Sequence, residues 1–273
     1  MNKKMTGFRK SLLFLLIPSL LGIAYLGSTV LSYSASKKDK SIVRVNNFTR
    51  SCELLNVEKH KDHIKVSVQN NSDKAVTAFV LTSRIDPRMV FTFKEEFAFS
   101  EMDTVIRPGE SYDRVLSIPG SLSRLAEINL NLSAIVFEDN SSEGDPHIIR
   151  DVEDNRLGQK IQFMKVLPVI ERLSRLSESE IGISWNKTAW HELEVALNAS
   201  NTESLSNLNR KPLGNDDSGN PSKQFESGVQ SAKESVFQKY QDLKDIRERH
   251  GTTALRDSVI ALKEVYTRMI SKL

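Results

Sequence analysis

The chain has 273 residues, of which 39% are hydrophobic and 27% charged, so it can bury a core and is neither wholly disordered nor collagen-like. Its single cysteine, Cys52, excludes an intrachain disulfide and a cysteine-based zinc ribbon. Residues 1–40 hold seven Lys or Arg and one acid. This leaves 31 basic and 34 acidic residues in the rest of the chain and argues against a nucleic-acid binder.

The N-terminal segment has a basic stretch followed by an apolar stretch, as an export signal does. Residues 11–31 contain no charged residue and follow Lys3, Lys4, Arg9 and Lys10. A helix of 21 residues rises about 30 Å, enough to cross the hydrocarbon core, which favours a retained anchor. Small residues at 32–36 leave cleavage open, so residues 1–36 are predicted to be a signal anchor or a signal peptide. We expect the following chain to lie outside the cytoplasm, in the cell envelope or periplasm, and to be secreted if the signal is cleaved.

Residues 51–145 are predicted to form β-structure. Apolar residues from Ile64 to Val68 alternate with polar ones, and an Asn-Asn-Ser-Asp turn at 70–73 leads to a second apolar run. Arg107-Pro108-Gly109-Glu110 has Pro and Gly at the two central positions of a type II turn. From Ile128 to Val136, five apolar residues alternate strictly with their neighbours, which predicts one buried and one largely wetted face. These patterns predict an antiparallel two-sheet sandwich of about seven strands.

The order of these pieces resembles bacterial immunoglobulin-like or fibronectin-like extracytoplasmic domains. The segment 136–145 is also similar to parts of uncharacterised exported bacterial proteins. The resemblance implies a sandwich that acts as a spacer, an adhesion module or a partner-binding surface, with no catalytic residues to transfer. The Cys and Trp positions of antibody-type domains are absent.

The pattern becomes helical after Pro146. Apolar residues recur three and four apart across 146–198, with Asp145 as the expected N-cap. Pro168 is expected to kink or restart the first helix, and a shorter helix is expected from Lys187 to Leu197. Residues 199–222 are rich in Ser, Asn, Asp, Gly and Pro, which predicts a disordered linker.

The final segment, 223–273, is predicted to be an antiparallel helical hairpin broken at Gly251. Its second half carries an apolar stripe at the heptad period, formed by Leu255, Val259, Leu262, Tyr266, Met269 and Leu273. This stripe needs a partner. The two helices are expected to cover each other, to dock on the helix near 149–176, or to meet another protein chain.

Two groups of residues have metal-ligand chemistry, and neither predicts a metal site. His60 and His63 lie near Cys52 in sequence, but in an extended segment their side chains would point to opposite faces among lysines. Asp139-x-Ser141-x-Glu143 imitates the start of an EF-hand loop, but Arg150 occupies the position that requires a bidentate Glu. A looser calcium loop at 138–145 stays open.

Aromatic residues are expected to fill cores. Four Phe between Phe91 and Phe99 are expected inside the sandwich, with an exposed binding edge as the alternative. Trp185 and Trp190 are expected to pack against the sandwich, with ligand stacking as the alternative.

The sequence therefore predicts an α+β protein with an immunoglobulin-like antiparallel sandwich, a helical region and an N-terminal membrane segment. No nucleophile elbow, phosphate loop or zinc-protease helix occurs, so no catalytic, cofactor-binding or metal-ligating residue is assigned and no cofactor is expected. The favoured function is a non-catalytic, membrane-anchored binding or scaffold protein. Residues 11–31 would anchor it in the membrane. Its C-terminal helices would bind an unknown protein or a second copy of the chain. The alternative is an exported hydrolase whose site lies where the sandwich meets the helices, near Glu138, Asp139, His147 and Trp185.

Overall fold

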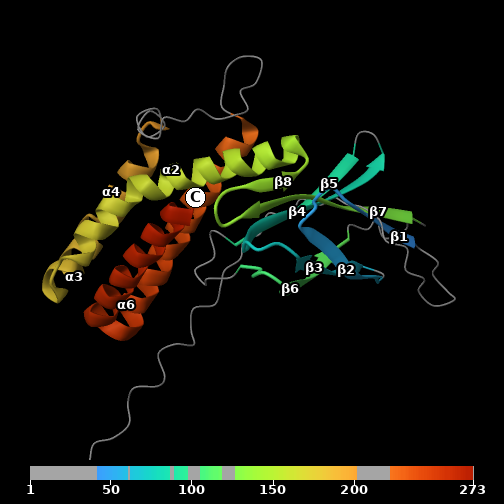
Figure 1. Ribbon diagram of the computed structural model, residues 1–273. Coiled ribbons are helices and arrows are strands. Elements are labelled where there is room, and N and C mark those ends of the chain that lie inside the picture. The colour runs from blue at the N-terminus through green and yellow to red at the C-terminus, as the bar shows by residue number, and fades with distance from the viewer. Residues whose placement is uncertain are drawn as a thin grey trace, which may run out of the picture.

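The computed structural model describes residues 42–60, 62–86, 89–97, 105–118, 127–201 and 222–272. These ranges form an α+β protein in which two β-sheets lie at one end and a group of helices at the other (Figure 1). The predicted membrane segment 11–31 and most of the predicted linker, residues 202–221, lie outside them. No helix in the described part of the chain is both long enough and apolar enough to cross a bilayer.

The described ranges contain eight strands and four helices. The strands are β1 (Ile42–Asn47), β2 (Cys52–Lys59), β3 (His63–Asn70), β4 (Val76–Asp86), β5 (Met89–Glu96), β6 (Ser111–Ser117), β7 (Glu127–Phe137) and β8 (Ser142–Gly144). The helices are α2 (Pro146–Ser174), α3 (Glu178–Lys187), α4 (Ala189–Asn198) and α6 (Lys223–Lys272).

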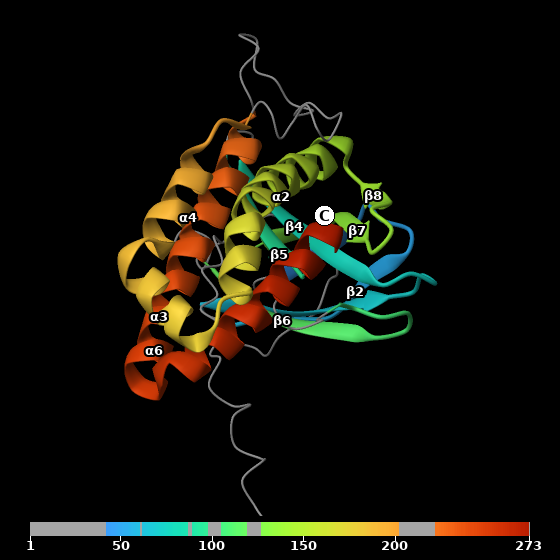
Figure 2. The same cartoon turned by 90° about the vertical axis from the view of Figure 1, so that its left-hand side faces the viewer.

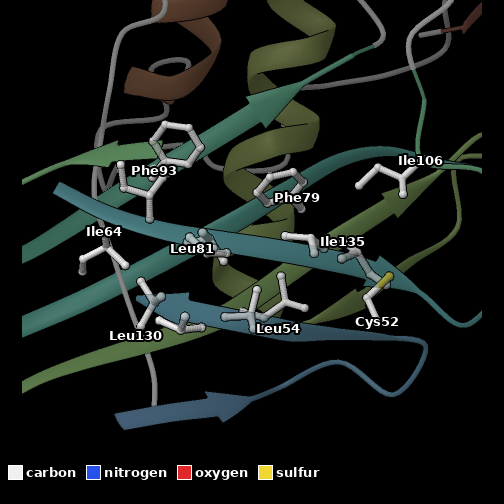
Figure 3. Close-up of a cluster of buried hydrophobic side chains, with 14 of the residues drawn as sticks. Cys52, Leu54, Ile64, Phe79, Leu81, Phe93, Ile106, Leu130 and Ile135 are labelled. Carbon is white, nitrogen blue, oxygen red and sulfur yellow. The ribbon is translucent and has the colours of Figure 1, made fainter. Parts of the chain in front are cut away.

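One sheet has the strand order β1-β7-β4-β5, with β8 also paired to β7, and the other has the order β2-β3-β6. Their apolar faces meet in a single cluster, to which β2 contributes Leu54, β4 contributes Phe79 and Leu81, and β7 contributes Leu130 and Ile135 (Figure 3). The pairing of β1 with β7 is parallel, and β1 begins before residue 51, whereas the sequence predicted antiparallel strands from residue 51. In β1, Val43 is buried in this cluster and Val45 packs against it, so the strand alternates over only a few residues.

Two predicted turns meet at one corner of the sheets. Gly109 has φ +77°, and the Glu110 N–H donates to the Arg107 carbonyl at 3.0 Å, as the Pro-Gly sequence predicted. The fully buried Asn70 side chain donates to the carbonyls of Lys74, at 2.7 Å, and Ile106, at 2.8 Å. Asn70 thus satisfies backbone groups of the neighbouring loops and fixes the turn at 70–73.

Strand β7 changes its buried face in mid-course, contrary to the predicted strict alternation. Ile128, Leu130 and Leu132 point into the cluster between the sheets, and then Ile135 and Phe137 do so, although they belong to the other parity. The change falls where β7 exchanges neighbours, because its parallel pairing with β1 ends at Leu132 and its antiparallel pairing with β8 begins at Ala134. Neither face of residues 133–137 is wetted, since each of these residues is buried.

Helix α2 covers the outer face of this sheet. Asp145 caps the helix as predicted, with its side chain accepting from the backbone N–H of His147 at 2.8 Å. Ala78 and Ala134 are small enough to let the first turns of α2 approach, and Val80, Val136 and Val152 complete a second apolar cluster. This covering helix is the reason why β7 is buried on both sides.

A buried ionic network fixes α2 on the sheet. The Arg156 guanidinium pairs with the Glu96 carboxylate at 2.6 Å and donates to Thr77 Oγ1 at 3.0 Å. Lys94 donates to Asn155 Oδ1 at 2.7 Å. Burial lowers the pKa of Lys94, and the neighbouring Glu96 carboxylate opposes that shift. The polar face of α2 thus meets polar side chains of β4 and β5.

The helices after residue 146 differ from the prediction in two places. Helix α2 continues through Pro168 to Ser174 without restarting, which leaves the kink as the expected alternative. It is followed by α3, which the sequence did not predict. Only Ile181 and Trp185 of α3 are buried, too few for a visible stripe, although Ser177 and Glu180 form a capping box that the sequence displays. The expected helix from Lys187 to Leu197 is α4, which begins two residues later.

Helix α6 folds back on itself at Gly251, whose φ of +84° breaks the helix where the sequence predicted (Figure 1). We call residues 223–250 its first arm and residues 252–272 its second arm. Leu255, Val259, Leu262, Tyr266 and Met269 of the heptad stripe are buried in one cluster with residues of α2, α3 and α4. Figure 2 shows α6 beside α2, so the stripe already has its partner within the chain. The stripe thus packs on the helix near 149–176, which was one of the three expected partners, and it no longer supports the predicted contact with another chain.

Candidate interaction surface

Glu138 and Asp139, near the predicted hydrolase site, and Glu143 of the possible calcium loop each hold a loop in place. Glu138 accepts from the Ala75 N–H at 3.3 Å, and Asp139 pairs with Lys74 at 2.6 Å. Glu143 accepts from the N–H groups of residues 50 and 51 at 2.8 and 3.0 Å. These carboxylates tie β8 and its turn to neighbouring segments.

The pKa shifts of these carboxylates agree with structural roles. Hydrogen bonds from Lys74 and Ser141 hold the pKa of Asp139 far below its usual range. Burial alone would raise the pKa of Glu143, but donors from residues 50 and 51 outweigh it and lower the pKa. Both groups are therefore held as carboxylates at neutral pH, which does not suit a general acid.

The other two members of the predicted site do not join them. His147 lies exposed in the first turn of α2. Trp185 is buried in the cluster of the four helices, where it stacks on Tyr240 with ring centroids 5.1 Å apart. Among the described residues, no group of three or more His, Cys, Asp or Glu side chains is arranged to hold a metal ion. The structure therefore does not assemble a site from Glu138, Asp139, His147 and Trp185.

The histidine pair differs from its predicted geometry. The rings of His60 and His63 stack with centroids 4.4 Å apart, because the β2–β3 turn brings them together instead of leaving them on opposite faces. His63 Nδ1 lies 2.8 Å from Asp62 Oδ1. Cys52 is buried inside the sheet cluster (Figure 3). Its Sγ lies 3.8 Å from Asn70 Oδ1.

A second buried carboxylate, Glu95, joins the open edges of the two sheets. It accepts from the Tyr112 hydroxyl at 3.3 Å and pairs with Arg114 at 3.0 Å. Burial raises the pKa of Glu95, and Arg114 opposes that shift. Phe93 and Phe97 lie buried beside it, which places these two of the four predicted core Phe in the core; Phe99 lies outside the described residues.

Three accessible aromatic residues meet where α4 lies beside the first arm of α6. Trp190 of α4 contacts Phe237 edge-on, with centroids 5.3 Å apart, and Tyr240 at 4.9 Å. Trp190 and Tyr240 are half-buried, whereas Phe237 is 47% exposed. We call Trp190, Phe237 and Tyr240 the aromatic seam.

Polar contacts at both ends align the two helices along the aromatic seam. Arg247 donates to Asn186 Oδ1 of α3, just before α4 begins, at one end, and Lys233 donates to Asn198 Oδ1 of α4 at 3.0 Å at the other. Since residue numbers rise along one helix and fall along the other, α4 and the first arm are antiparallel. The aromatic seam thus lies between two fixed ends and on rigid elements.

Positive charge accompanies the aromatic seam. Lys233, Lys244 and Arg247 recur with Phe237 and Tyr240 at spacings of four and three along the first arm, which places them on one helical face. None of these three cations forms an ion pair within 4.0 Å in the part of the chain that the structure describes. On other faces of the same arm, Lys239 pairs with Asp242 and Arg249 with Asp245. The accessible aromatic surface is therefore bordered by cations that no carboxylate neutralises.

The sequence does not predict this surface, because which apolar residue of the first arm is buried depends on the neighbouring helices. The sequence led us to expect both tryptophans packed on the sandwich. In the structure Val236 takes the buried stripe position at 2% exposure, so Phe237, turned by about 100° on the helix, points outward. Two adjacent large apolar residues on an amphipathic helix were the available signal.

One further concavity lies on the outer side of α2 and α3. It is an open groove of about 340 Å³, lined by Arg172, Leu176, Glu180, Ile183, Ser184, Lys187 and Thr188. Arg172 already pairs with Glu192, so no convergent set of free polar groups marks the groove as a site.

Comparison of the chain with protein-family models, with curated protein sequences and with solved structures found no match.

Proposed function

We propose that this chain is a membrane-anchored, extracytoplasmic and non-catalytic binding or scaffold protein that makes contact through the aromatic seam. The main support for this proposal is that Trp190, Phe237 and Tyr240 form an accessible group on two rigid helices. The membrane segment at 11–31 supplies the anchor in this proposal. The contact surface is the aromatic seam and not the heptad stripe, because the stripe is buried among the helices.

The chemistry of the aromatic seam supports contact with another surface. Aromatic side chains bury a large apolar area with few rotatable bonds, which is why they dominate binding energies at interfaces. Arg247 and Lys233, each held by an asparagine, keep the flanking charge in place. The carboxylates that a hydrolase would need are committed to loop contacts, which leaves the binding function as the better supported one.

The two sheets serve as a spacer in this proposal, in the manner of immunoglobulin-like domains. Support comes from the single apolar cluster between the sheets and from the mostly polar outer face of β6, where Ser111, Asp113 and Ser117 are exposed together with Val115. Helix α2 fastens the helical part to the sheet through Arg156 and Glu96, so a force or an orientation is transmitted between them.

Two measurements test the proposal. A reporter fused after Leu273 is expected to be active outside the cytoplasm, and activity confined to the cytoplasm contradicts the location. A photo-crosslinking residue in place of Phe237, 47% exposed, is expected to form adducts in intact membranes. The matched control replaces Val115, 54% exposed on β6, and is expected to form far fewer adducts.

Equal labelling at positions 237 and 115 contradicts the binding surface. Loss of cellular function in Glu138→Gln or His147→Ala, with folding intact, would instead favour the exported hydrolase.

A further inference from the structure

We infer that the aromatic seam, with Lys233, Lys244 and Arg247, lies against the anionic headgroup surface of the same membrane that carries the chain's anchor. This inference rests on the proposed anchoring and names the occupant of the surface. The occupant is a sheet of anionic phospholipid headgroups rather than a protein.

The side-chain types of the seam suit a bilayer interface. Indole and phenol rings have an apolar body and a polar edge, and they concentrate at the headgroup level of membranes. Phe237 is the most exposed of the three rings and is the one that would enter the acyl boundary. The Trp190 ring contacts both other rings, with its centroid 5.3 Å from that of Phe237 and 4.9 Å from that of Tyr240. The three rings therefore act as one wedge.

The charges favour lipid headgroups over a neutral partner. Lys233 and Arg247 are held by asparagine amides, which orient them without cancelling their charge. Lys244 and Lys187 are exposed nearby in sequence. Among the described residues of α4 and the first arm near the seam, the acids without an ion pair are Glu194, Glu234 and Glu248. Cations therefore outnumber acids around the seam, and each unpaired cation strengthens the attraction to an anionic membrane surface.

The length of chain before β1 keeps the body close to the bilayer. Only residues 32–41 separate the predicted anchor from Ile42, and ten residues span at most about 35 Å. A tethered surface meets the membrane at a high effective concentration, so a weak contact of three rings and a few cations is enough to be occupied. A soluble protein partner would gain nothing from this tether.

The chain carries its own probe for this contact. It has two tryptophans, of which Trp185 is 3% exposed beneath Tyr240 and Trp190 belongs to the aromatic seam. Trp185→Phe in the full chain leaves Trp190 as the single fluorophore. The variant is reconstituted in phosphatidylcholine vesicles with or without phosphatidylglycerol, and in the same vesicles made with lipids brominated near the headgroup.

Bromolipids are expected to quench Trp190 at least twofold in vesicles that contain phosphatidylglycerol, and much less in phosphatidylcholine alone. A charge-reversal variant, Lys233→Glu with Lys244→Glu and Arg247→Glu, is expected to lose the quenching. Phe237→Ser is expected to weaken it and tests the wedge with the cations intact. Circular dichroism and urea unfolding verify that each variant is folded.

The outcomes separate the inference from the proposal on which it rests. Flotation of the chain with vesicles but no bromolipid quenching overturns the inference and leaves the anchor standing. Failure to float overturns both. Shielding of Trp190 from acrylamide without bromolipid quenching, dependent on protein concentration, assigns the surface to a second copy of the chain and also overturns the inference.

Discussion

Gly158 of α2 and Gly228 of α6 lie where the backbones of the two helices touch. A Cβ on Gly228 would be 2.0 Å from the Asn155 carbonyl oxygen, and a Cβ on Gly158 would be 2.3 Å from the Phe225 carbonyl oxygen. Both obstacles are backbone atoms, which cannot rotate away as a side chain does. The crossing of α2 with the first arm of α6 therefore requires glycine on both helices.

Gly228→Ala is expected to destabilise the fold by about 3 kcal/mol, because the crossing must open to admit a methyl group. The measurement is the free energy of unfolding in urea. Gly182→Ala is the matched control: it is also helical, but its Cβ would meet only the Thr252 side chain at 3.0 Å. Since alanine favours helix by about 1 kcal/mol, this control is expected to be neutral or stabilising. Equal losses in both variants would contradict the backbone contact.

Arg156→Met is expected to cost about 3 kcal/mol, because it strands part of the buried charge of Glu96. The side chains of the pair are only 4% and 11% exposed. The double variant with Glu96→Met is expected to lose less than the two single changes together. Arg44→Met is the control, because its pair with Glu127 is 52% and 39% exposed and is worth under about 1 kcal/mol. Additive losses for Arg156 and Glu96 would show that the pair does not couple α2 to the sheet.

Cys52 is expected to be inert to thiol reagents in the native state. The residue is 1% exposed, and burial raises the pKa of its thiol to about 12. At pH 8 its thiolate fraction is then about a thousandfold below that of an ordinary cysteine, whose pKa is about 8.5. The aromatic disulfide reagent DTNB should therefore label one thiol per chain in urea and almost none without it. Rapid labelling of the folded chain would contradict the burial of Cys52 and the packing of β2.

Local chemistry explains which parts of the fold the sequence predicts. The turn at Gly109, the cap at Asp145 and the break at Gly251 each depend on a residue whose own conformational preference decides the backbone. Two-residue alternation likewise revealed β3, where Ile64, Val66 and Val68 face one cluster. These features need no knowledge of distant segments.

The features that the sequence did not predict depend on contacts between distant segments. The alternation of β7 fails at Ser133 because β8 and α2 cover a face that would be wetted in an isolated sheet. The aromatic seam depends on α4 lying beside the first arm of α6, and residues 199–222 separate the two helices. Periodicity shows that a helix has an apolar face but not which neighbour covers it, so Trp190 was expected on the wrong partner.

The two ends of residues 202–221 are fixed close together on α2. Asn201 Oδ1 accepts from the Gln162 side chain at 2.9 Å, and Ser222 donates to the Asp154 carboxylate. Positions 154 and 162 are two turns apart on one helix, a rise of about 12 Å. A replacement of residues 202–221 by six Gly and Ser residues spans about 20 Å and so reaches between the same two ends.

This replacement is expected to leave the free energy of unfolding unchanged or to raise it by about 1 kcal/mol. The reason is that closing a loop of six residues costs less entropy than closing one of twenty. The shortened chain should keep the helical circular dichroism and the urea midpoint of the parent. A two-residue replacement is the control, because it cannot span 12 Å and should pull Asn201 or Ser222 from α2. A large loss of stability in the six-residue variant would show instead that residues 202–221 pack on the fold, and would overturn their prediction as a linker.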